Sequence, residues 1–351
     1  MAVLEKFYAA LSLADWGYVD MDTRQLIIDT AEKIFADHCQ KSLLDSAEKG
    51  IFPQDLWGKI VANGFHQLGS AGSGTDAADL YAFLKVCGRF SVPLPMAEVL
   101  LSNQWLSSEA SEASEASETT VSGSDFASIG RLNDTSINQV PWGRKANKVL
   151  GVAADSHKVL VMDAPSINEQ GSNLAGEAHD TFLLAGSERE IELEDSPFAQ
   201  MALARTNLMA GGLQATLDLG LQFASERSQF GRSISKFQAI QHSLAVVAAE
   251  VAAAQRAADA AVDALGTDRF IDEVSASKAR VGEAVGIVAE QVHQVHGAMG
   301  FTYEHRLHHF TRRLWAWRDE WGNEFYWQAK LGSRLAAMGA DKVWGYIATR
   351  G

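Results

Sequence analysis

The sequence of 351 residues contains only two cysteines, Cys39 and Cys87, which lie far apart and form no CxxC pair. We therefore expect neither a disulfide framework nor a thiolate metal site, and this cysteine usage is typical of a reducing cytoplasm. Positive charge is also scarce, because 30 Lys and Arg face 44 Asp and Glu, for a formal net charge of -14. Nucleic acids and anionic membranes need clustered Lys and Arg, so neither is an expected partner, whereas a local basic pocket for an anionic cofactor stays open.

Long apolar runs are missing as well. No stretch approaches the roughly 20 apolar residues that span a bilayer. The first 22 residues carry acidic side chains within and after a short apolar run and no basic segment before it, unlike a secretory signal. With 47% hydrophobic residues, the chain can still bury sizeable cores. We expect a cytoplasmic globular protein that forms either one large unit or two to three packed subdomains.

Four segments differ in composition and periodicity. The first repeats apolar positions at helical spacing, as in TRQLIIDTAEKIFADHC, and the second is a Ser/Glu/Ala repeat that cannot bury a core. The third changes to short runs such as KVLVMDA and DTFLLAG bounded by turn residues, and the last returns to helical periodicity. We predict an N-terminal helical domain (1–106), a low-complexity linker (107–120), a middle β-domain (121–200) and a C-terminal helical bundle (201–351).

The predicted fold is therefore mainly α, with a small barrel-like β-domain in the middle. The bundle contains an alanine-rich helix at 243–265, whose small side chains permit close packing, and a further long helix that Gly297 closes. The glycine-rich stretch at 69–76 lacks the Lys and Ser/Thr ending of a phosphate-binding loop. We interpret it as a flexible loop that enters a helix.

Five histidines near the end of that long helix have spacings that could present nitrogen ligands on one helix face. They are His293, His296, His305, His308 and His309. No acidic or cysteine residue accompanies them at a metal-site spacing. We predict that they pack or cap within the bundle, and we predict no metal site.

The sharpest local pattern is ASERSQFGRSISKFQAIQH, residues 224–242. Arg227 ends one amphipathic helix, Phe230 and Gly231 make a break, and Gln238 begins the next helix. An arginine beside a helix break suits a pyrophosphate, because its donors pair bidentately with phosphate oxygens. On the spacing alone, an arginine that caps a helix hairpin is the favoured alternative.

This stretch resembles the R-x-x-FG-x(6)-Q signature of acyl-CoA dehydrogenases, and QVHGAMGFTYEH (294–305) resembles that family's Q-x-x-GG-x-G-(Y/F)-T-x-E motif. The order of domains also fits, so the resemblance covers essentially the whole chain. It implies a flavoenzyme in which FAD lies between subunits. The resemblance places the pyrophosphate and adenine end of a neighbour's FAD against Arg227, Phe230, Gln238, Gln294, Gly297 and Ala298, the last of which replaces the motif's second glycine.

The resemblance also implies a carboxylate that removes a proton from the acyl thioester while the flavin accepts a hydride. In many members it is the glutamate of a (Y/T)EG(T/S) motif, and the equivalent window is Glu320, Trp321, Gly322 and Asn323. Trp321 thus stands where the glutamate is expected. The neighbours Glu320 and Asp319 are the candidate bases, although one helical step rotates a side chain by roughly 100°.

Other members carry the base on the helix that precedes R-x-x-FG. Near the expected places on that helix stand Ala204, Arg205 and Leu221, and Asp218 is interpreted as a structural residue or a substrate-side contact. No (T/S)EPxAGSD-like flavin-facing segment is found. Trp142 could approach a flavin or acyl group, but packing at a turn beside Pro141 is the favoured interpretation.

The segment TRRLWAWRDEWGNEFYWQ, residues 311–328, holds four of the nine tryptophans and is expected to be helical around a junction. Trp317 and Trp321 lie four apart and would share a helix face. We expect most of these rings to pack at a subunit interface. The arginines of this segment should pair with the acidic excess or face solvent; they are Arg312, Arg313 and Arg318.

The resemblance is strongest to the non-catalytic partner chains of heterotetrameric acyl-CoA dehydrogenases, including those acting on steroid side-chain thioesters. It implies FAD as cofactor, acyl-CoA as substrate, a paralogous partner chain (α2β2) and an electron-transfer flavoprotein as acceptor. Two alternatives stay open. One is a self-sufficient homo-oligomer that uses Glu320 or Asp319 as base, and the other is a flavin-free acyl-CoA-binding or structural protein.

Overall fold

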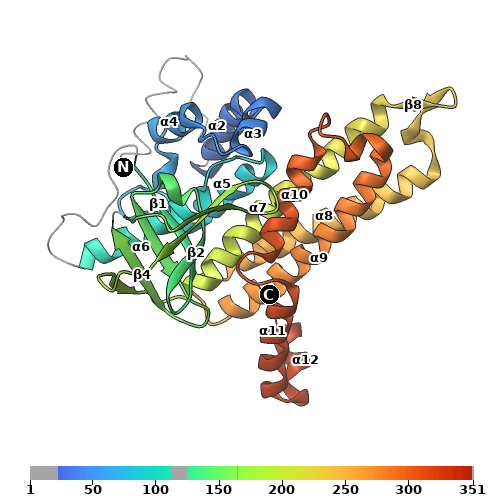
Figure 1. Cartoon of the computed structure of the whole chain (residues 1–351). Coiled ribbons are helices and arrows are strands. Elements are labelled where there is room, and N and C mark those ends of the chain that lie inside the picture. Colours follow the sequence, from blue (N-terminus) through green and yellow to red (C-terminus); the bar gives the residue numbers. More distant parts are fainter. Residues whose placement is uncertain (1–22, 113–124, 164, 350–351) are drawn as a thin grey trace, which may run out of the picture.

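The computed structural model describes residues 23–112, 125–163 and 165–349, and its elements follow the order helices, strands, helices (Figure 1). This order confirms the predicted fold class. Within the described ranges, every helix is too short or too polar to cross a membrane. The N-terminal helices are α2 (Thr23–His38), α3 (Lys41–Ala47), α4 (Gln54–Ala62), α5 (Ala77–Arg89) and α6 (Met96–Glu112).

Local sequence explains where these helices begin and end. Asp76 caps α5, because its side chain accepts from the Asp79 amide while the Asp79 side chain accepts from the Asp76 amide. The glycine-rich stretch before it forms turns, as predicted. Helix α6 runs to Glu112 and so enters the predicted linker, of which 113–120 lie outside the described residues.

The middle of the chain forms one seven-stranded sheet in the order β5-β6-β2-β1-β3-β4-β7, antiparallel except for the β1–β3 pair. Helix α6 covers one face at β1, and a small separate core around Phe182 and Met162 fills the other. The strands are β1 (Ala127–Leu132), β2 (Ser136–Pro141), β3 (Lys148–Val152), β4 (Lys158–Asp163), β5 (Glu169–Ser172), β6 (Ala178–Leu183) and β7 (Arg189–Glu192).

Three of the C-terminal helices, α8, α9 and α10, pack against the long helix α7, whereas α11 packs against α9 (Figure 1). Helices α7, α8 and α9 extend beyond the N-terminal part as an arm that ends in the β8–β9 hairpin, and α11 with α12 projects in another direction. The elements are α7 (Pro197–Glu226), β8 (Ser228–Gln229), β9 (Arg232–Ser233), η3 (Ile234–Lys236), α8 (Gln238–Asp263), α9 (Phe270–His296), η4 (Gly297–Phe301), α10 (Leu307–Asp319), α11 (Glu324–Met338) and α12 (Ala340–Ala348).

The N-terminal helices and the bundle meet most closely where α5 crosses α7. A Cβ atom on Gly211 would lie 1.9 Å from the carbonyl oxygen of Lys85, and one on Gly88 would lie 2.0 Å from that of Leu208. Only glycine leaves room for this backbone contact. The crossing therefore fixes how α7 sits beneath the N-terminal helices.

Candidate functional site

The chain turns sharply between α10 and α11, at residues 320–323, which we call the helix junction. Trp321 and Gly322 both have left-handed backbone, with φ of 57° and 88°. A Cβ on Gly322 would lie 2.7 Å from Trp327 Nε1, so this position requires glycine. Because α10 ends at Asp319, Trp317 and Trp321 do not share a helix face, and that prediction is wrong.

The tryptophans around the junction pack inside the chain. Trp317, Trp321 and Trp327 are all buried in its main core. The Trp321 ring meets Phe198 edge-on at 5.6 Å between centroids, and Trp327 Nε1 donates to the Trp321 carbonyl oxygen at 3.0 Å. The expectation of a subunit interface is wrong for these three rings, because the left-handed turn and the return of α11 against α9 enclose them.

Glu320 is held by an arginine from the middle of the chain. Arg205 on α7 donates to Glu320 through Nε and to Glu98 on α6 through a second nitrogen. Asn173 Nδ2 donates to the other Glu320 oxygen at 3.2 Å, and Arg205 and Glu98 are almost completely buried. Arg205, one of the residues near the base position on α7, therefore forms a buried ion pair with Glu320, the neighbour of the other expected base position, Trp321.

This pairing decides the acid–base character of Glu320. Burial would raise the pKa of its carboxyl, but the charge of Arg205 and the proximity of His179 outweigh burial and lower the pKa below its usual range. A carboxylate that serves as a general base at neutral pH works best with a pKa raised toward the working pH. Asp319, the other candidate, is exposed at the end of α10.

The space beside Glu320 is small. The cavity there is lined by Trp142, Arg205, Trp317 and Glu320 among others and has a volume of about 30 Å³. That volume holds one or two water molecules and is far below the roughly 300–1,000 Å³ of ligand pockets. Trp142 is buried and meets Phe52 edge-on at 5.1 Å, which agrees with the favoured packing role.

A buried lysine that the sequence analysis missed holds the junction together. Lys278 on α9 donates from Nζ to the carbonyl oxygens of Trp317 (3.3 Å), Arg318 (2.6 Å) and Gly322 (2.8 Å). It satisfies carbonyls that the end of α10 would otherwise leave without partners. Burial lowers the pKa of Lys278 to about 7. Nothing in the pattern SASKARVGE indicated this contact.

The two sequence motifs come together at the end of the long arm, which we call the bundle tip (residues 227–238 and 294–303). Helix α7 ends at Glu226 with Arg227 as its C-cap, and the β8–β9 hairpin turns at Phe230 and Gly231, which both have positive φ. Ile234 and Val295 share one apolar cluster, so the first motif packs against the end of α9. Gly297 follows α9 with φ of 57°, as predicted.

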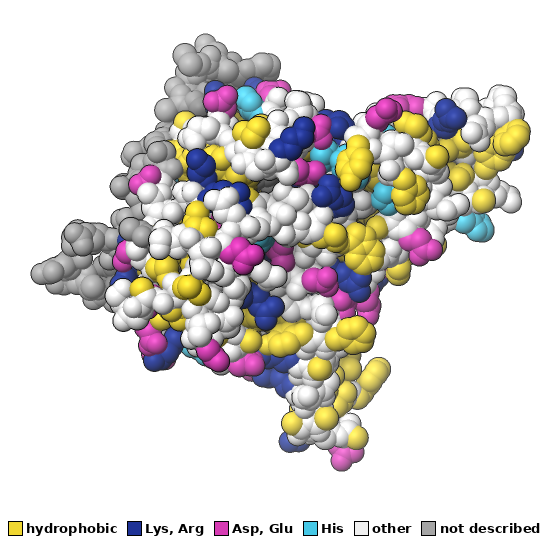
Figure 2. Space-filling view, viewed as in Figure 1, with side chains coloured by type: hydrophobic (Ala, Val, Ile, Leu, Met, Phe, Trp, Pro, Cys, Tyr) yellow, Lys and Arg dark blue, Asp and Glu magenta, His cyan; other side chains and the backbone are white. Residues whose placement is uncertain are grey.

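The predicted cofactor-binding residues of the bundle tip all face solvent. Phe230 is 91% exposed, and the neighbouring Phe301 is 75% exposed. Apolar side chains are visible at this end of the molecule in Figure 2. No other atom would lie within 4 Å of a Cβ on Gly297, so the backbone here is open to approach. The exposed set is Arg227, Phe230, Gln238, Gln294, Gly297 and Ala298.

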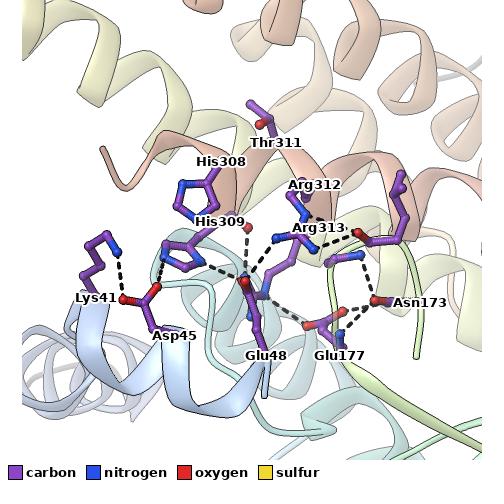
Figure 3. A network of polar contacts seen from close by, with 12 residues as sticks. Lys41, Asp45, Glu48, Asn173, Glu177, His308, His309, Thr311, Arg312 and Arg313 are labelled. Atoms are coloured by element: carbon purple, nitrogen blue, oxygen red, sulfur yellow. Dashed lines mark hydrogen bonds and ion pairs between the residues drawn. The ribbon is translucent and has the colours of Figure 1, made fainter. Parts of the chain in front are cut away.

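A second polar network links α3 to α10 (Figure 3). Glu48 at the end of α3 accepts from His309 Nδ1 at 2.6 Å, Arg313 at 2.9 Å and Arg312 at 3.1 Å. Arg313 is fully buried and also reaches Glu177 at 3.1 Å. Together with the pair of Arg318 and Glu324, these contacts confirm the prediction that the arginines of this segment pair with acidic residues.

The histidines divide into two groups. His296 stacks on Phe223 at 4.3 Å, and His293 lies 3.0 Å from the Thr311 hydroxyl, which are the predicted packing roles. His308 and His309, in contrast, lie beside Asp45 of α3. The sequence analysis found no acidic companion for them, because this one comes from the other end of the chain. Asp218 accepts from Gln214 at 2.9 Å, in keeping with a structural role.

Comparisons with known proteins show similarity to acyl-CoA dehydrogenases. The family model of the acyl-CoA dehydrogenase C-terminal domain matches residues 196–318. The protein "Acyl-CoA dehydrogenase IpdE2" of Mycobacterium tuberculosis is 26% identical over 308 residues, which cover 83% of this chain and 91% of that protein. The ChsE4-ChsE5 complex of the same organism gives a TM-score of 0.80 at 18% identity, over 93% of this chain and 100% of the matched chain. Butyryl-CoA dehydrogenase of Megasphaera elsdenii gives 0.74 at 14% identity, over 92% and 100%.

Proposed function

Since the chain belongs to the acyl-CoA dehydrogenase family, whose members are oxidoreductases that act on acyl-CoA, we propose that it is one subunit of a heteromeric, FAD-dependent enzyme. In this proposal it completes the FAD site of a partner chain and contributes no catalytic base. The observation that carries the proposal is the small space beside Glu320, which has a volume of about 30 Å³ and is lined by the Arg205–Glu320 ion pair.

The bundle tip has the chemistry that the pyrophosphate and adenine end of FAD needs. Arg227 would pair with the pyrophosphate, and Phe230 and Gln238 would flank the adenosine. The open backbone at Gly297 and the small side chain of Ala298 would let the chain approach the cofactor closely, and Gln294 would line the same end. When bound, FAD supplies the hydride acceptor for oxidation of the acyl thioester.

The remaining machinery would come from the partner. A paralogous acyl-CoA dehydrogenase chain would carry the proton-abstracting carboxylate and the flavin-facing segment, in an α2β2 assembly in the cytoplasm. The ChsE4-ChsE5 complex, which shares the fold, supports a pairing of two different chains. An electron-transfer flavoprotein would take up the electrons.

The self-sufficient alternative finds less support. Glu320 is tied to Arg205 with a lowered pKa, and Asp319 is exposed at the molecular surface. Neither carboxylate therefore has the desolvated, unpaired setting that favours proton abstraction. A flavin-free acyl-CoA-binding protein differs from both in a simple observable, because its complexes would contain no flavin.

The test is to purify the chain alone and with a co-expressed paralogue, and to measure flavin by visible absorption and dehydrogenase activity with acyl-CoA. We expect flavin and activity only in the complex. Arg227→Gln should lower the FAD content of the complex, whereas Arg256→Gln, an exposed arginine farther along α8, should not. One FAD per chain together with activity in the chain alone would contradict the proposal.

The candidate bases are tested in the same complex. Amide replacement, Glu320→Gln and Asp319→Asn, should leave most of the activity in both variants. Loss of activity in either variant, with flavin content unchanged, would support the self-sufficient alternative. A complex without flavin would support the acyl-CoA-binding alternative.

A further inference from the structure

Three side chains from opposite ends of the sequence meet between α3 and α10. Asp45 belongs to α3, and His308 and His309 belong to the first turn of α10. One potential ligand atom from each lies within 4.8 Å of the others. Figure 3 shows both imidazole rings above Asp45, with Lys41 to its left and Glu48 on the other side of His309.

Hydrogen bonds at the other ring nitrogen set the tautomer of both histidines. His309 Nδ1 lies 2.6 Å from a Glu48 carboxylate oxygen, and His308 Nδ1 lies 2.7 Å from the carbonyl oxygen of His305. Both acceptors lack hydrogens, so both Nδ1 atoms must donate. In neutral rings the Nε2 atoms then carry free lone pairs. Histidines that bind metals are oriented in this way, by a carboxylate or a backbone carbonyl on the far nitrogen.

The two Nε2 atoms have no hydrogen-bond partner among the described residues, although both are buried. His309 is completely buried and His308 is only 8% exposed. A buried polar atom without a partner costs about 1–3 kcal/mol, so two such atoms side by side need an explanation. A metal ion between them would accept both lone pairs.

The spacing between His309 and Asp45 fits a small divalent ion. His309 Nε2 lies 3.1 Å from Asp45 Oδ1, outside hydrogen-bond geometry. Ligand atoms about 2.0–2.1 Å from a tetrahedral zinc ion lie roughly 3.3–3.4 Å apart, which is close to this separation. Lys41 Nζ contacts the other carboxylate oxygen, Oδ2, at 2.7 Å and so leaves Oδ1 available. The half-exposed Asp45 side chain gives the ion a path from solvent.

We propose that Asp45, His308 and His309 form a binding site for a divalent transition-metal ion, with zinc as the best match. Two imidazole nitrogens and one carboxylate oxygen are ligands that zinc accepts readily, and three protein ligands leave a fourth position for water. The ion links α3 of the N-terminal helices to α10 of the bundle. Its role is therefore a structural cross-link, and it does not depend on the proposed function.

The competing explanation is a metal-free ion pair, in which a protonated His309 lies between Asp45 and Glu48. The two explanations differ in what His308 does, because the ion pair needs no contribution from it. They also differ in the effect of added metal on stability. A metal ion that binds the folded chain but not the unfolded chain raises the melting temperature. A metal-free ion pair gives no such response to added metal.

The experiment uses the full-length chain, freed of any histidine tag and stripped with a chelator, and measures zinc uptake by equilibrium competition with a chromophoric chelator. We expect one zinc ion per chain. Asp45→Asn and His308→Gln should each weaken zinc binding by at least about 100-fold, since even the outer partners of metal ligands contribute 10- to 100-fold. His242→Gln, an exposed histidine on α8, serves as the matched control and should bind zinc like the wild type.

A melting curve of each variant with and without zinc is the second measurement. Zinc should raise the melting temperature of the wild type and of the His242 variant but not that of the Asp45 variant, whose side chain is half-exposed and tolerates the change. Absence of uptake in excess zinc would overturn the proposal. So would equal uptake by the wild type and by the Asp45 and His308 variants, which would indicate an adventitious ion only.

Discussion

The helix junction and the bundle tip lie in the same half of the chain, yet their polar and aromatic groups have opposite surroundings. At the junction, Glu320 is paired with Arg205, the tryptophans are buried, and Lys278 donates to three carbonyl oxygens. At the tip, Arg227 has no ion pair among the described residues, and Phe230 is 91% exposed. Groups with partners in their own chain serve the fold, whereas exposed ones are available to another molecule.

The comparison also has an energetic side. A buried ion pair is weak evidence of net stabilisation, but removal of one partner leaves the other charge unpaired at a large cost. Exposed side chains carry no such penalty. Substitutions at the junction should therefore act on folding, and those at the tip should act on binding alone.

The largest effect is expected from Arg205→Met, which keeps the volume of the side chain and removes its charge. Glu98 and Glu320 would remain buried without their shared partner, so the free energy of unfolding should fall by about 3–5 kcal/mol. Urea unfolding followed by circular dichroism measures this. The control Arg256→Met removes an exposed arginine and should change stability little. A similarly small effect of Arg205→Met would contradict the inference that the buried ion pair at the junction serves the fold.

A somewhat smaller loss is expected from Gly322→Ala. The new methyl group would require left-handed backbone in alanine and would meet Trp327 Nε1 and Tyr326, for a combined cost of about 2–4 kcal/mol. Gly345→Ala in α12 is the matched change, because its φ is ordinary and no atom lies within 4 Å. Thermal unfolding should show a lowered midpoint for the first variant only. Equal midpoints for the two variants would contradict the claim that the helix junction has no room for a side chain at position 322.

The pH dependence of stability tests Glu320 directly. Its folded pKa lies below the ordinary 4.5, so its ion pair contributes fully above pH 4.5 and is lost as pH falls through the folded pKa. Glu320→Gln should cost about 1–3 kcal/mol at neutral pH and make the decline of stability in acid shallower. Asp319→Asn, which removes an exposed carboxylate, should change the stability at neutral pH by less than about 0.5 kcal/mol. Unfolding midpoints measured across the acid range decide between these outcomes.

The smallest effect on folding is expected at the bundle tip. Arg227→Gln should change the free energy of unfolding by less than about 0.5 kcal/mol, because the side chain is exposed. A loss of FAD from the complex without a loss of stability would sharpen the contrast with Arg205. A large destabilisation would instead favour the helix-capping role that the spacing also fits.

The spacing of apolar residues along the chain predicted much of the fold. The long helices α8 and α9 and the strands β4 and β6 have apolar patterns that the sequence analysis recognised. Strand β5 escaped notice because all four of its residues are exposed and leave no apolar signal. The hairpin at Phe230 was anticipated as a break, since glycine follows at the turn.

The candidate site was less predictable, because its contacts join distant parts of the chain. Arg205 and Glu320 lie 115 positions apart, and Glu48 and Arg313 lie 265 apart. No local pattern encodes such pairs. The sequence also gives no indication that the backbone of Trp321 is left-handed, because tryptophan has no preference for this conformation. For that reason the buried position of the ring was missed.

The close crossing of α5 and α7 at Gly88 and Gly211 has a mechanical consequence. Side chains between two helices can make room by changing rotamer. Where two backbones are in direct contact, no rotatable side chain can move aside. Helices α5 and α7 therefore cannot slide past each other at this crossing. The crossing thus anchors the root of the arm to the N-terminal helices.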